Sequence, residues 1–170
     1  MKPAAPAPVV VVMGVSGCGK STVGTALAEG LGVPFEDGDD LHPAANKAKM
    51  KAGSPLDDAD RRPWLDEVGA WLAGHPDGGV MACSALKRVY RDQLRGHLPA
   101  VTWLHLAGDP EVIAGRQAGR EGHFMPSSLM HTQLATLEPL DPDEGGLVVD
   151  VGRSVAEIVD EAVEALAPSS

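Results

Sequence analysis

A glycine-rich segment that follows a run of valines constrains this chain more than any other feature of its sequence. Residues 14–22 read GVSGCGKST and come directly after the apolar run VVVVM at 9–13. Glycines let backbone N–H groups turn inward around a phosphate, and the first turn of a following helix adds free N–H groups and the positive end of its dipole. The segment therefore predicts a buried strand, a phosphate-binding loop and a helix, in that order.

The side chains of this loop suit a nucleoside triphosphate bound with Mg²⁺. Lys20 supplies a point charge to the β- and γ-phosphates, and the hydroxyl of Ser21 is a hard oxygen ligand for the metal. The predicted nucleotide-binding residues are Gly14, Val15, Ser16, Gly17, Cys18, Gly19, Lys20, Ser21 and Thr22. A chance glycine-rich turn is the alternative, but it does not account for a complete pattern set between a strand and a helix.

Length and composition favour one domain and disfavour some classes of partner. A chain of 170 residues, 44% of them apolar, can build one well-cored domain but not two of ordinary size. The formal net charge of -10 disfavours nucleic acid or an anionic membrane surface as an electrostatic partner. Two cysteines, Cys18 and Cys83, are too few for a disulfide framework, which fits a reduced, cytoplasmic protein.

Strands and helices are expected in alternation, which predicts a three-layer α/β/α fold with a parallel sheet of about five strands. The expected strands lie near 9–13, 34–37, 79–83, 101–106 and 146–150. The expected helices lie near 20–31, 43–52, 57–74, 87–96, 109–118, 127–137 and 154–166. Residues 1–8 are expected to form a disordered tail and residues 9–168 a single domain.

Two acidic residues follow the second expected strand, in the segment FEDGDDLHP at 35–43. Ligands of open α/β sheets bind outside the carboxyl ends of the strands, so Asp37 and Asp39 are expected beside the phosphate loop if the first two strands lie close together. We assign Asp37 to the Mg²⁺ shell and Asp39 to the acceptor hydroxyl, as orienting group or general base. Alternatively, Asp37 starts a turn and Asp39 caps the next helix.

The third expected strand, at 79–83, is followed by Ser84 and lacks the acidic residue that an ATPase driving motion places at this strand end. A small-molecule kinase can use this strand end to contact its substrate, with a hydroxyl from Ser84 and a positive charge from Lys87. A purely structural role for Ser84, as a helix cap, is equally open. Arg91, Arg95 and Lys51 are expected on solvated helix faces.

Two arginines four residues apart precede a short segment that glycines bracket and a proline ends, at 116–126. This pattern predicts a lid at about 116–127 that closes over the nucleotide and brings Arg116 and Arg120 to the transferring phosphoryl group. Surface arginines at a helix end are the alternative. His123 is predicted either to contact the substrate or to pack as a structural side chain.

Four stretches of the chain resemble bacterial gluconokinases of the small P-loop type, over about residues 9 to 151. They are GVSGCGKST at 14–22, FEDGDDLHPAANKAKMKAGSPLDDADRRPWL at 35–65, ACSALKRVYRDQLR at 82–95 and GRQAGREGHFMPSSLMHTQLATLE at 115–138. The resemblance implies a P-loop kinase fold, ATP as phosphate donor, and D-gluconate as the acceptor of a phosphate at its 6-hydroxyl. It also implies a homodimer.

The resemblance places the family's functional positions on residues of this chain. Lys20, Asp39, Arg116 and Arg120 are the predicted catalytic residues, and Ser21 and Asp37 the predicted metal ligands. A substrate-binding helical region is expected at about 40–75. The predicted substrate residues are Asp39, His42, Asn46, Lys49, Arg61, Arg62, Ser84, Lys87 and His123. Cys18 and Arg62 depart from the serine and lysine common at these positions.

Two other functions remain open from the sequence. The first is a kinase of the same fold that acts on another small anionic acceptor, such as shikimate or adenylyl sulfate, although the DGD and LHP stretches count against it. The second is a non-catalytic regulator that binds a nucleotide and engages a protein partner. It would bind nucleotide without acceptor-dependent turnover.

The role assigned to Asp39 gives a direct test. Asp39→Asn is expected to lower kcat by ~10²-fold or more while nucleotide binding is kept, because the amide cannot accept the proton of the acceptor hydroxyl. Steady-state kinetics together with a nucleotide titration measure both quantities. Turnover close to that of the wild type would refute the assignment.

Overall fold

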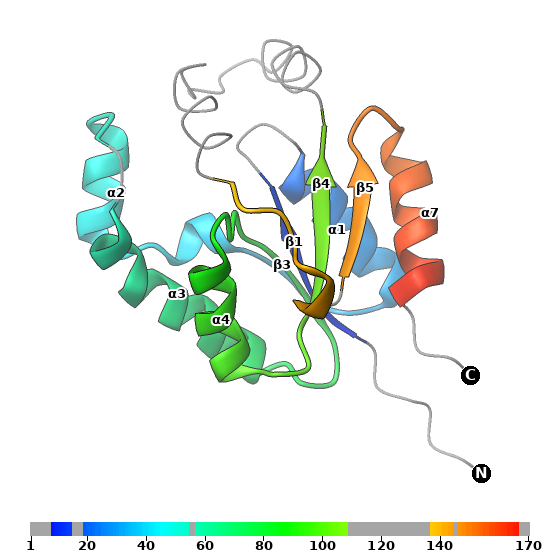
Figure 1. Ribbon diagram of the computed structural model, residues 1–170, viewed down its shortest axis with the longest axis horizontal. Coiled ribbons are helices and arrows are strands. Elements are labelled where there is room, and N and C mark those ends of the chain that lie inside the picture. Colours follow the sequence, from blue (N-terminus) through cyan, green and yellow to red (C-terminus); the bar gives the residue numbers. More distant parts are fainter. Residues whose placement is uncertain (1–7, 15–18, 55–56, 109–136, 145, 167–170) are drawn as a thin grey trace.

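The computed structural model describes residues 8–14, 19–54, 57–108, 137–144 and 146–166. Within these ranges the chain forms five strands and five α-helices, in the order that the sequence predicts (Figure 1). The predicted tail apart from Pro8, the predicted helix at 109–118, most of that at 127–137 and the predicted lid lie outside the described residues. The side chain of Asp39 also lies outside them.

In chain order, the described elements are β1 Val9–Met13, α1 Lys20–Leu31, β2 Phe35–Asp37, the 3-10 turn η1 Gly38–Leu41, α2 Ala44–Lys51, α3 Asp58–Ala73, β3 Gly79–Ala82, α4 Arg88–His97, β4 Thr102–Ala107, the 3-10 turn η2 Pro142–Glu144, β5 Gly146–Asp150 and α7 Val155–Leu166. Two α-helices, α2 and α3, follow each other between β2 and β3, within the region where the sequence predicts a substrate-binding helical part.

The described strands form one parallel sheet in the order β2-β3-β1-β4-β5. Strand β3 therefore lies between β1 and β2, so the first two strands of the chain are not direct neighbours. Ala82 at the end of β3 pairs with Val12 on one side and with Asp37 on the other. The carboxyl ends of β1, β2 and β3 consequently lie at the same level on one edge of the sheet.

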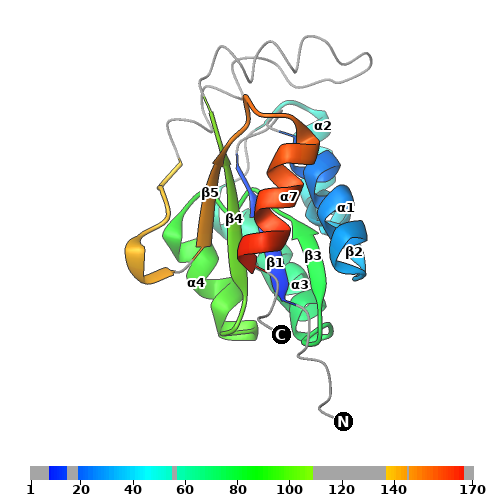
Figure 2. The same ribbon diagram turned by 90° about the vertical axis from the view of Figure 1, so that its right-hand side faces the viewer.

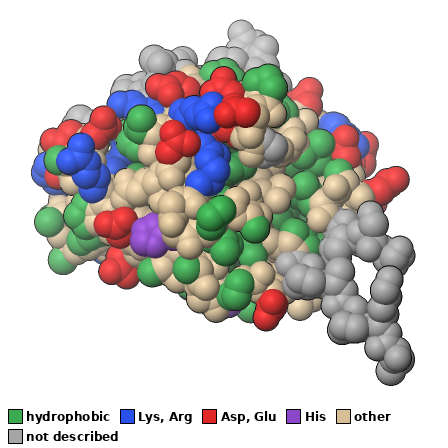
Figure 3. All heavy atoms as spheres, turned by 60° about the horizontal axis from the view of Figure 1, so that its bottom comes forward, with side chains coloured by type: hydrophobic (Ala, Val, Ile, Leu, Met, Phe, Trp, Pro, Cys, Tyr) green, Lys and Arg blue, Asp and Glu red, His purple; other side chains and the backbone are tan. Residues whose placement is uncertain are grey.

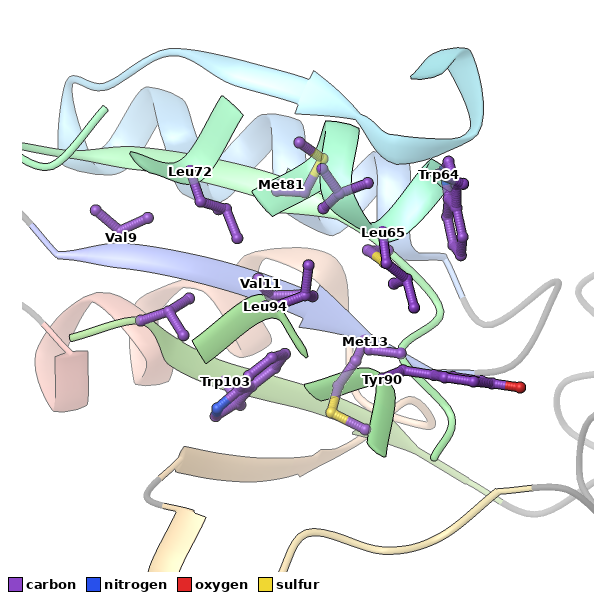
Figure 4. Packing of buried hydrophobic residues seen from close by; sticks show 14 residues of the cluster. Val9, Val11, Met13, Trp64, Leu65, Leu72, Met81, Tyr90, Leu94 and Trp103 are labelled. Carbon is purple, nitrogen blue, oxygen red and sulfur yellow. The ribbon is translucent and has the colours of Figure 1, made fainter. Parts of the chain in front are cut away.

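Helices cover both faces of the sheet (Figures 1 and 2). On one face, α1 and α7 pack over side chains such as Val10, Val12 and Leu104. On the other face, α3 and α4 cover the alternate residues Val11 and Met13, together with Trp103 (Figure 4). Both faces are apolar because a parallel sheet is buried on both sides. The three-layer α/β/α class predicted from the sequence is thus confirmed.

The start of α3 is fixed by its own side chains. Asp57 caps the helix by accepting a hydrogen bond from the Asp60 backbone N–H at 2.7 Å, and the Asp60 side chain accepts one from the Asp57 N–H at 3.0 Å. This reciprocal capping box satisfies two N–H groups that would otherwise lack partners. It fixes the start of the helix at Asp58, one residue inside the expected range of 57–74.

One contact joins α3 to the end of β2. The indole N–H of Trp64, itself buried, donates to the Gly38 carbonyl at 2.7 Å. Gly38 also packs closely on the end of β3, because a Cβ at this position would lie 2.6 Å from the Ala82 carbonyl oxygen. The turn after Asp37 is therefore held between α3 and the sheet.

Gly38→Ala is expected to lower the free energy of unfolding by about 1–3 kcal/mol, because the new methyl group has to displace backbone. Gly96→Ala is the matched control: a Cβ at Gly96 meets nothing within 4 Å, and the residue lies inside α4. This control should be neutral or stabilise by up to about 1 kcal/mol. Urea unfolding of both variants measures the difference, and equal stability of Gly38→Ala and the wild type would contradict the packing described.

Candidate active site

The phosphate loop is described at its two flanks, Gly14 and Gly19–Thr22, whereas residues 15–18 lie outside the described ranges. Gly19 precedes α1 with φ 95°, a left-handed conformation that favours glycine. The Lys20 ammonium donates to the carbonyl of Gly14, the residue at which the loop begins, at 3.0 Å. The first turn of α1 and the lysine thus lie where the sequence predicts phosphate binding.

Ser21, in the first turn of α1, and Asp37, at the end of β2, lie together although β3 separates β2 from β1 in the sheet. The Ser21 hydroxyl donates to a carboxylate oxygen of Asp37 at 2.5 Å. Both are hard oxygen ligands, and the described residues hold no cluster of three or more His, Cys, Asp or Glu side chains that could bind a metal. Two oxygen ligands suit Mg²⁺, which takes its other ligands from water and phosphate.

A second group of polar side chains joins α3 to α4 around Tyr90. The Tyr90 hydroxyl donates to Asp58 at 2.5 Å and accepts from Arg61 at 3.1 Å. The Lys87 ammonium lies 3.1 Å from the same Asp58 oxygen. The ring of Tyr90 packs in the apolar cluster while its hydroxyl points out of it (Figure 4).

The hydrogen bonds in this group favour the ionised forms of Asp58 and Lys87. The pKa of Asp58 is lowered because Tyr90 and then Lys87 donate hydrogen bonds to it. The pKa of Lys87 is raised by its hydrogen bond to Asp58. Burial, followed by the hydrogen bond to Asp58, raises the pKa of Tyr90. Two cations and one carboxylate therefore leave a net charge of +1 around a neutral phenol.

His42 and Asn46, two predicted substrate residues, are buried between α2 and α3. The His42 ring stacks on Trp64 with a centroid distance of 4.2 Å. The Asn46 amide nitrogen lies 3.2 Å from the His42 Nδ1 and donates to the Asp60 carbonyl at 2.8 Å. These contacts use both side chains to join the helices, and substrate contact by either one stays a prediction.

The other predicted substrate residues differ in their surroundings. Lys49 forms an ion pair with Asp60 at 2.7 Å, and Arg62 is exposed. Ser84 is half-buried at the end of β3, in the loop of residues 83–87 that we call the β3–α4 loop. Arg116, Arg120 and His123 lie outside the described residues. Their roles, and that of the Asp39 side chain, stay predictions.

The expectation of solvated helix faces is wrong for Arg91 and correct for Lys51. Arg91 is fully buried and binds both oxygens of Glu144, at 2.8 and 3.0 Å. Arg95, which is partly buried, donates to Glu144 at 2.9 Å. Burial would raise the pKa of Glu144, but these hydrogen bonds, with one from the Asp141 N–H, lower it to about 2. The Glu144 carboxylate therefore stays ionised in the interior of the protein.

Sequence reasoning misses Asp58 and Tyr90 as members of the site. Asp58 reads as part of an acidic helix start, and nothing in its own spacing separates it from Asp57. Tyr90 does carry a signal: it is the single tyrosine of the chain and lies one helical turn after Lys87.

Basic and acidic side chains are intermixed on the surface that Figure 3 shows. The ion pairs of the structure agree with this mixing of charges: Arg88 is paired with Asp141 at 2.8 Å and with Asp143 at 2.7 Å. No helix among the described residues is both long and apolar enough to cross a membrane.

A parallel sheet with a glycine-capped helix, a loop lysine and a Ser–Asp pair at its carboxyl edge defines a P-loop kinase. A model of the shikimate kinase family matches residues 16–166. Gluconokinase of Gluconobacter oxydans (strain 621H) is 54% identical over 140 residues, which cover 79% of this chain and 78% of that protein. Thermosensitive gluconokinase of Escherichia coli is 42% identical over 160 residues, with coverage of 92% and 86%.

A solved structure agrees with these relatives. The crystal structure of a gluconokinase from Sinorhizobium meliloti 1021 superposes with a TM-score of 0.88 at 50% identity, and the match covers 96% of this chain and 93% of that one. The chain therefore belongs to the gluconokinase family, and to the wider shikimate kinase family whose model it matches. The resemblance drawn from the sequence is confirmed.

The buried position of His42 predicts a pH dependence of stability. Burial, and then the positive charges of Arg61 and Lys47, lower its pKa from 6.5 to about 4. The unfolded chain therefore binds an extra proton between these values, so the free energy of unfolding falls as the pH falls from about 6.5 to about 4. The loss is about 2 kcal/mol after allowance for partial solvation of the ring.

Urea unfolding at several pH values measures this slope in the wild type and in His42→Gln. The variant should lose much of the slope and keep the part due to His105, whose pKa is lowered by burial and by Arg91. The same slope in both proteins would contradict a buried neutral His42.

Proposed function

We propose that this gluconokinase family member transfers the γ-phosphate of ATP to the 6-hydroxyl of D-gluconate, giving 6-phospho-D-gluconate and ADP. The observation that carries the proposal is a cationic group, Arg61 and Lys87 around Tyr90, in a chain whose relatives are named gluconokinases. The β3–α4 loop that bears Lys87 follows a strand ending level with β1, which leads into the phosphate loop.

On the phosphate side, the proposal gives each residue one task. Lys20 would bind the β- and γ-phosphates and neutralise charge that develops on the transferring group. Ser21 and Asp37 would hold Mg²⁺, which supplies electrostatic stabilisation of the phosphates when bound. Their hydroxyl–carboxylate contact of 2.5 Å supports this pairing.

On the acceptor side, the group around Tyr90 suits a sugar acid. Its net charge of +1 favours one carboxylate, and Arg and Lys are the side chains that bind carboxylates with charge-assisted hydrogen bonds. The hydroxyls of a neutral sugar can accept hydrogen bonds from these two cations but carry no charge that pairs with them. We therefore place the carboxylate of gluconate near Arg61 and Lys87, where it competes with Asp58 for them.

The transfer step is proposed to proceed with Asp39 as base. The 6-hydroxyl oxygen forms a bond to the γ-phosphorus as its proton passes to the Asp39 carboxylate, and the bond from that phosphorus to the bridging oxygen of ADP breaks. Arg116 and Arg120 are proposed to stabilise the charge of the phosphoryl group during its transfer, a role that the resemblance alone supports.

A homodimer is proposed on the same resemblance, and a cytoplasmic location on the low cysteine content.

A coupled assay of ADP release tests the proposal. With Mg²⁺ and ATP, D-gluconate should stimulate turnover strongly, whereas shikimate, glucose or no acceptor should not. Lys87→Met should raise the KM for gluconate by about 10-fold or more, because a charged hydrogen bond to the substrate is lost. The KM for ATP should stay within about twofold, since Lys87 belongs to the acceptor side.

Lys51→Met serves as the matched control, because Lys51 is an exposed lysine at the end of α2 and is assigned no role. Its kinetics should equal those of the wild type. Nucleotide binding without stimulation by any acceptor would overturn the kinase proposal and favour a regulator. Stimulation by shikimate in place of gluconate would overturn the substrate.

A further inference from the structure

Arg91 and Glu144 form a buried ion pair that none of the proposed catalytic steps uses. Both side chains have an exposure of 0%. The guanidinium binds the carboxylate through two nitrogens, and the carboxylate also accepts from the Asp141 N–H at 2.8 Å and from Arg95 at 2.9 Å. Glu144 lies in the described segment 137–144, which leads into β5 and which we call the return segment.

The same guanidinium binds two backbone carbonyls from different parts of the chain. One nitrogen donates to the Ala85 carbonyl at 2.9 Å, and another donates to the Pro139 carbonyl at 3.2 Å. Ala85 belongs to the β3–α4 loop, and Pro139 belongs to the return segment. Arg91 therefore ties these two segments together from inside the protein.

The carbonyl that Arg91 holds belongs to a strained residue. Ala85 has φ 42°, and among the described residues no other non-glycine residue has a positive φ. Ala85 is also fully buried. Such a conformation costs on the order of 1–3 kcal/mol in an L-residue and persists only where surrounding contacts hold it. The bond from Arg91 is one of these contacts.

Further bonds tie the return segment to the same loop. The Glu138 backbone N–H donates to the Leu86 carbonyl at 2.7 Å, and the Glu138 carboxylate accepts from the Arg88 N–H at 3.0 Å. The residues so held, from Ala85 to Arg88, surround Lys87, and Ser84 comes directly before them. The two predicted substrate residues of this loop, Ser84 and Lys87, thus lie on a backbone segment whose conformation depends on these hydrogen bonds.

Stability alone does not require this arrangement, because a buried ion pair is often no more stabilising than an apolar pair of similar volume. An apolar pair, however, could not donate to the Ala85 and Pro139 carbonyls. We infer that Arg91 is a positioning residue that fixes the β3–α4 loop, and with it Lys87, for binding of the acceptor. This inference rests on the proposed function, because it gives Lys87 its substrate.

Loss of the hydrogen bonds from Arg91 should weaken binding of the acceptor and leave binding of the nucleotide unchanged. Without its bond to Arg91, Ala85 can relax to a negative φ, which moves Lys87 away from Asp58 and Tyr90. Lys20, Ser21 and Asp37 lie on α1 and β2, and the hydrogen bonds of Arg91 within the described part of the chain reach neither element. A split between the two Michaelis constants therefore separates positioning from a general structural role.

The test compares Arg91→Met/Glu144→Met with Arg95→Met. The double variant removes both charges together, so neither is left buried alone, and it removes the bonds to Ala85 and Pro139. Arg95→Met removes a bond to the same Glu144, but the described hydrogen bonds of Arg95 go to Asp92 and Glu144 and not to the loop. Arg91→Lys is the second variant, because it keeps the charge but cannot reach the carboxylate and both carbonyls at once.

For the double variant and for Arg91→Lys we expect the KM for gluconate to rise at least 10-fold while the KM for ATP changes less than twofold. Arg95→Met should leave both constants within twofold of the wild type. Unchanged gluconate kinetics in folded Arg91→Lys or in the folded double variant would overturn the inference, and so would an equal rise of both constants.

Hydrogen exchange gives a measurement that does not depend on the acceptor. Backbone amides in peptides covering 83–88 should exchange at least 10-fold faster in Arg91→Lys than in the wild type, and at an unchanged rate in Arg95→Met. Unchanged exchange at 83–88 in Arg91→Lys would overturn the inference that Arg91 fixes the β3–α4 loop. If the wild type does not phosphorylate gluconate, the proposed function fails, and the exchange rates alone decide whether Arg91 fixes the loop.

Discussion

Ala82 pairs with Val12 on one side and with Asp37 on the other, and this register determines where everything else in the site can lie. Because the strands are parallel, their carboxyl ends reach one edge of the sheet together. The phosphate loop follows β1, the Ser21 partner Asp37 ends β2, and the β3–α4 loop follows β3. The proposed metal and phosphate side and the proposed acceptor side are therefore built from adjacent strand ends.

The two sides differ in how their charges are held. The Ser21 hydroxyl donates to the Asp37 carboxylate, and both oxygens are of the hard kind that Mg²⁺ prefers. Around Tyr90, in contrast, the cations Arg61 and Lys87 are already satisfied by the hydroxyl and by Asp58. In the proposed reaction, an acidic acceptor takes over partners that the protein otherwise supplies to itself, which would favour ligands with a carboxylate over neutral sugars. The proposed selectivity for acids would thus follow from internal competition as well as from attraction.

The sequence predicts the fold well because its signals are local. The valine run and the glycine-rich loop each place an element within a residue or two, since β1 is expected at 9–13 and α1 at 20–31 and both are found there. The order of the strands in the sheet is harder to predict from the sequence, because the position of β3 between β1 and β2 depends on tertiary packing. Arg91 shows the same limit: its charge predicts a solvated position, and only its partner Glu144, 53 residues away, makes burial possible. Long-range pairs of this kind leave no periodic signal.

Identification of the reaction product tests the central claim most directly. After incubation with Mg²⁺, ATP and D-gluconate, ³¹P NMR should show one new phosphomonoester whose phosphorus couples to the two protons on C6, in equal amount to the ADP formed. That result is the one the proposed function predicts. ADP formed without a gluconate ester, or an ester at another hydroxyl, would contradict the account.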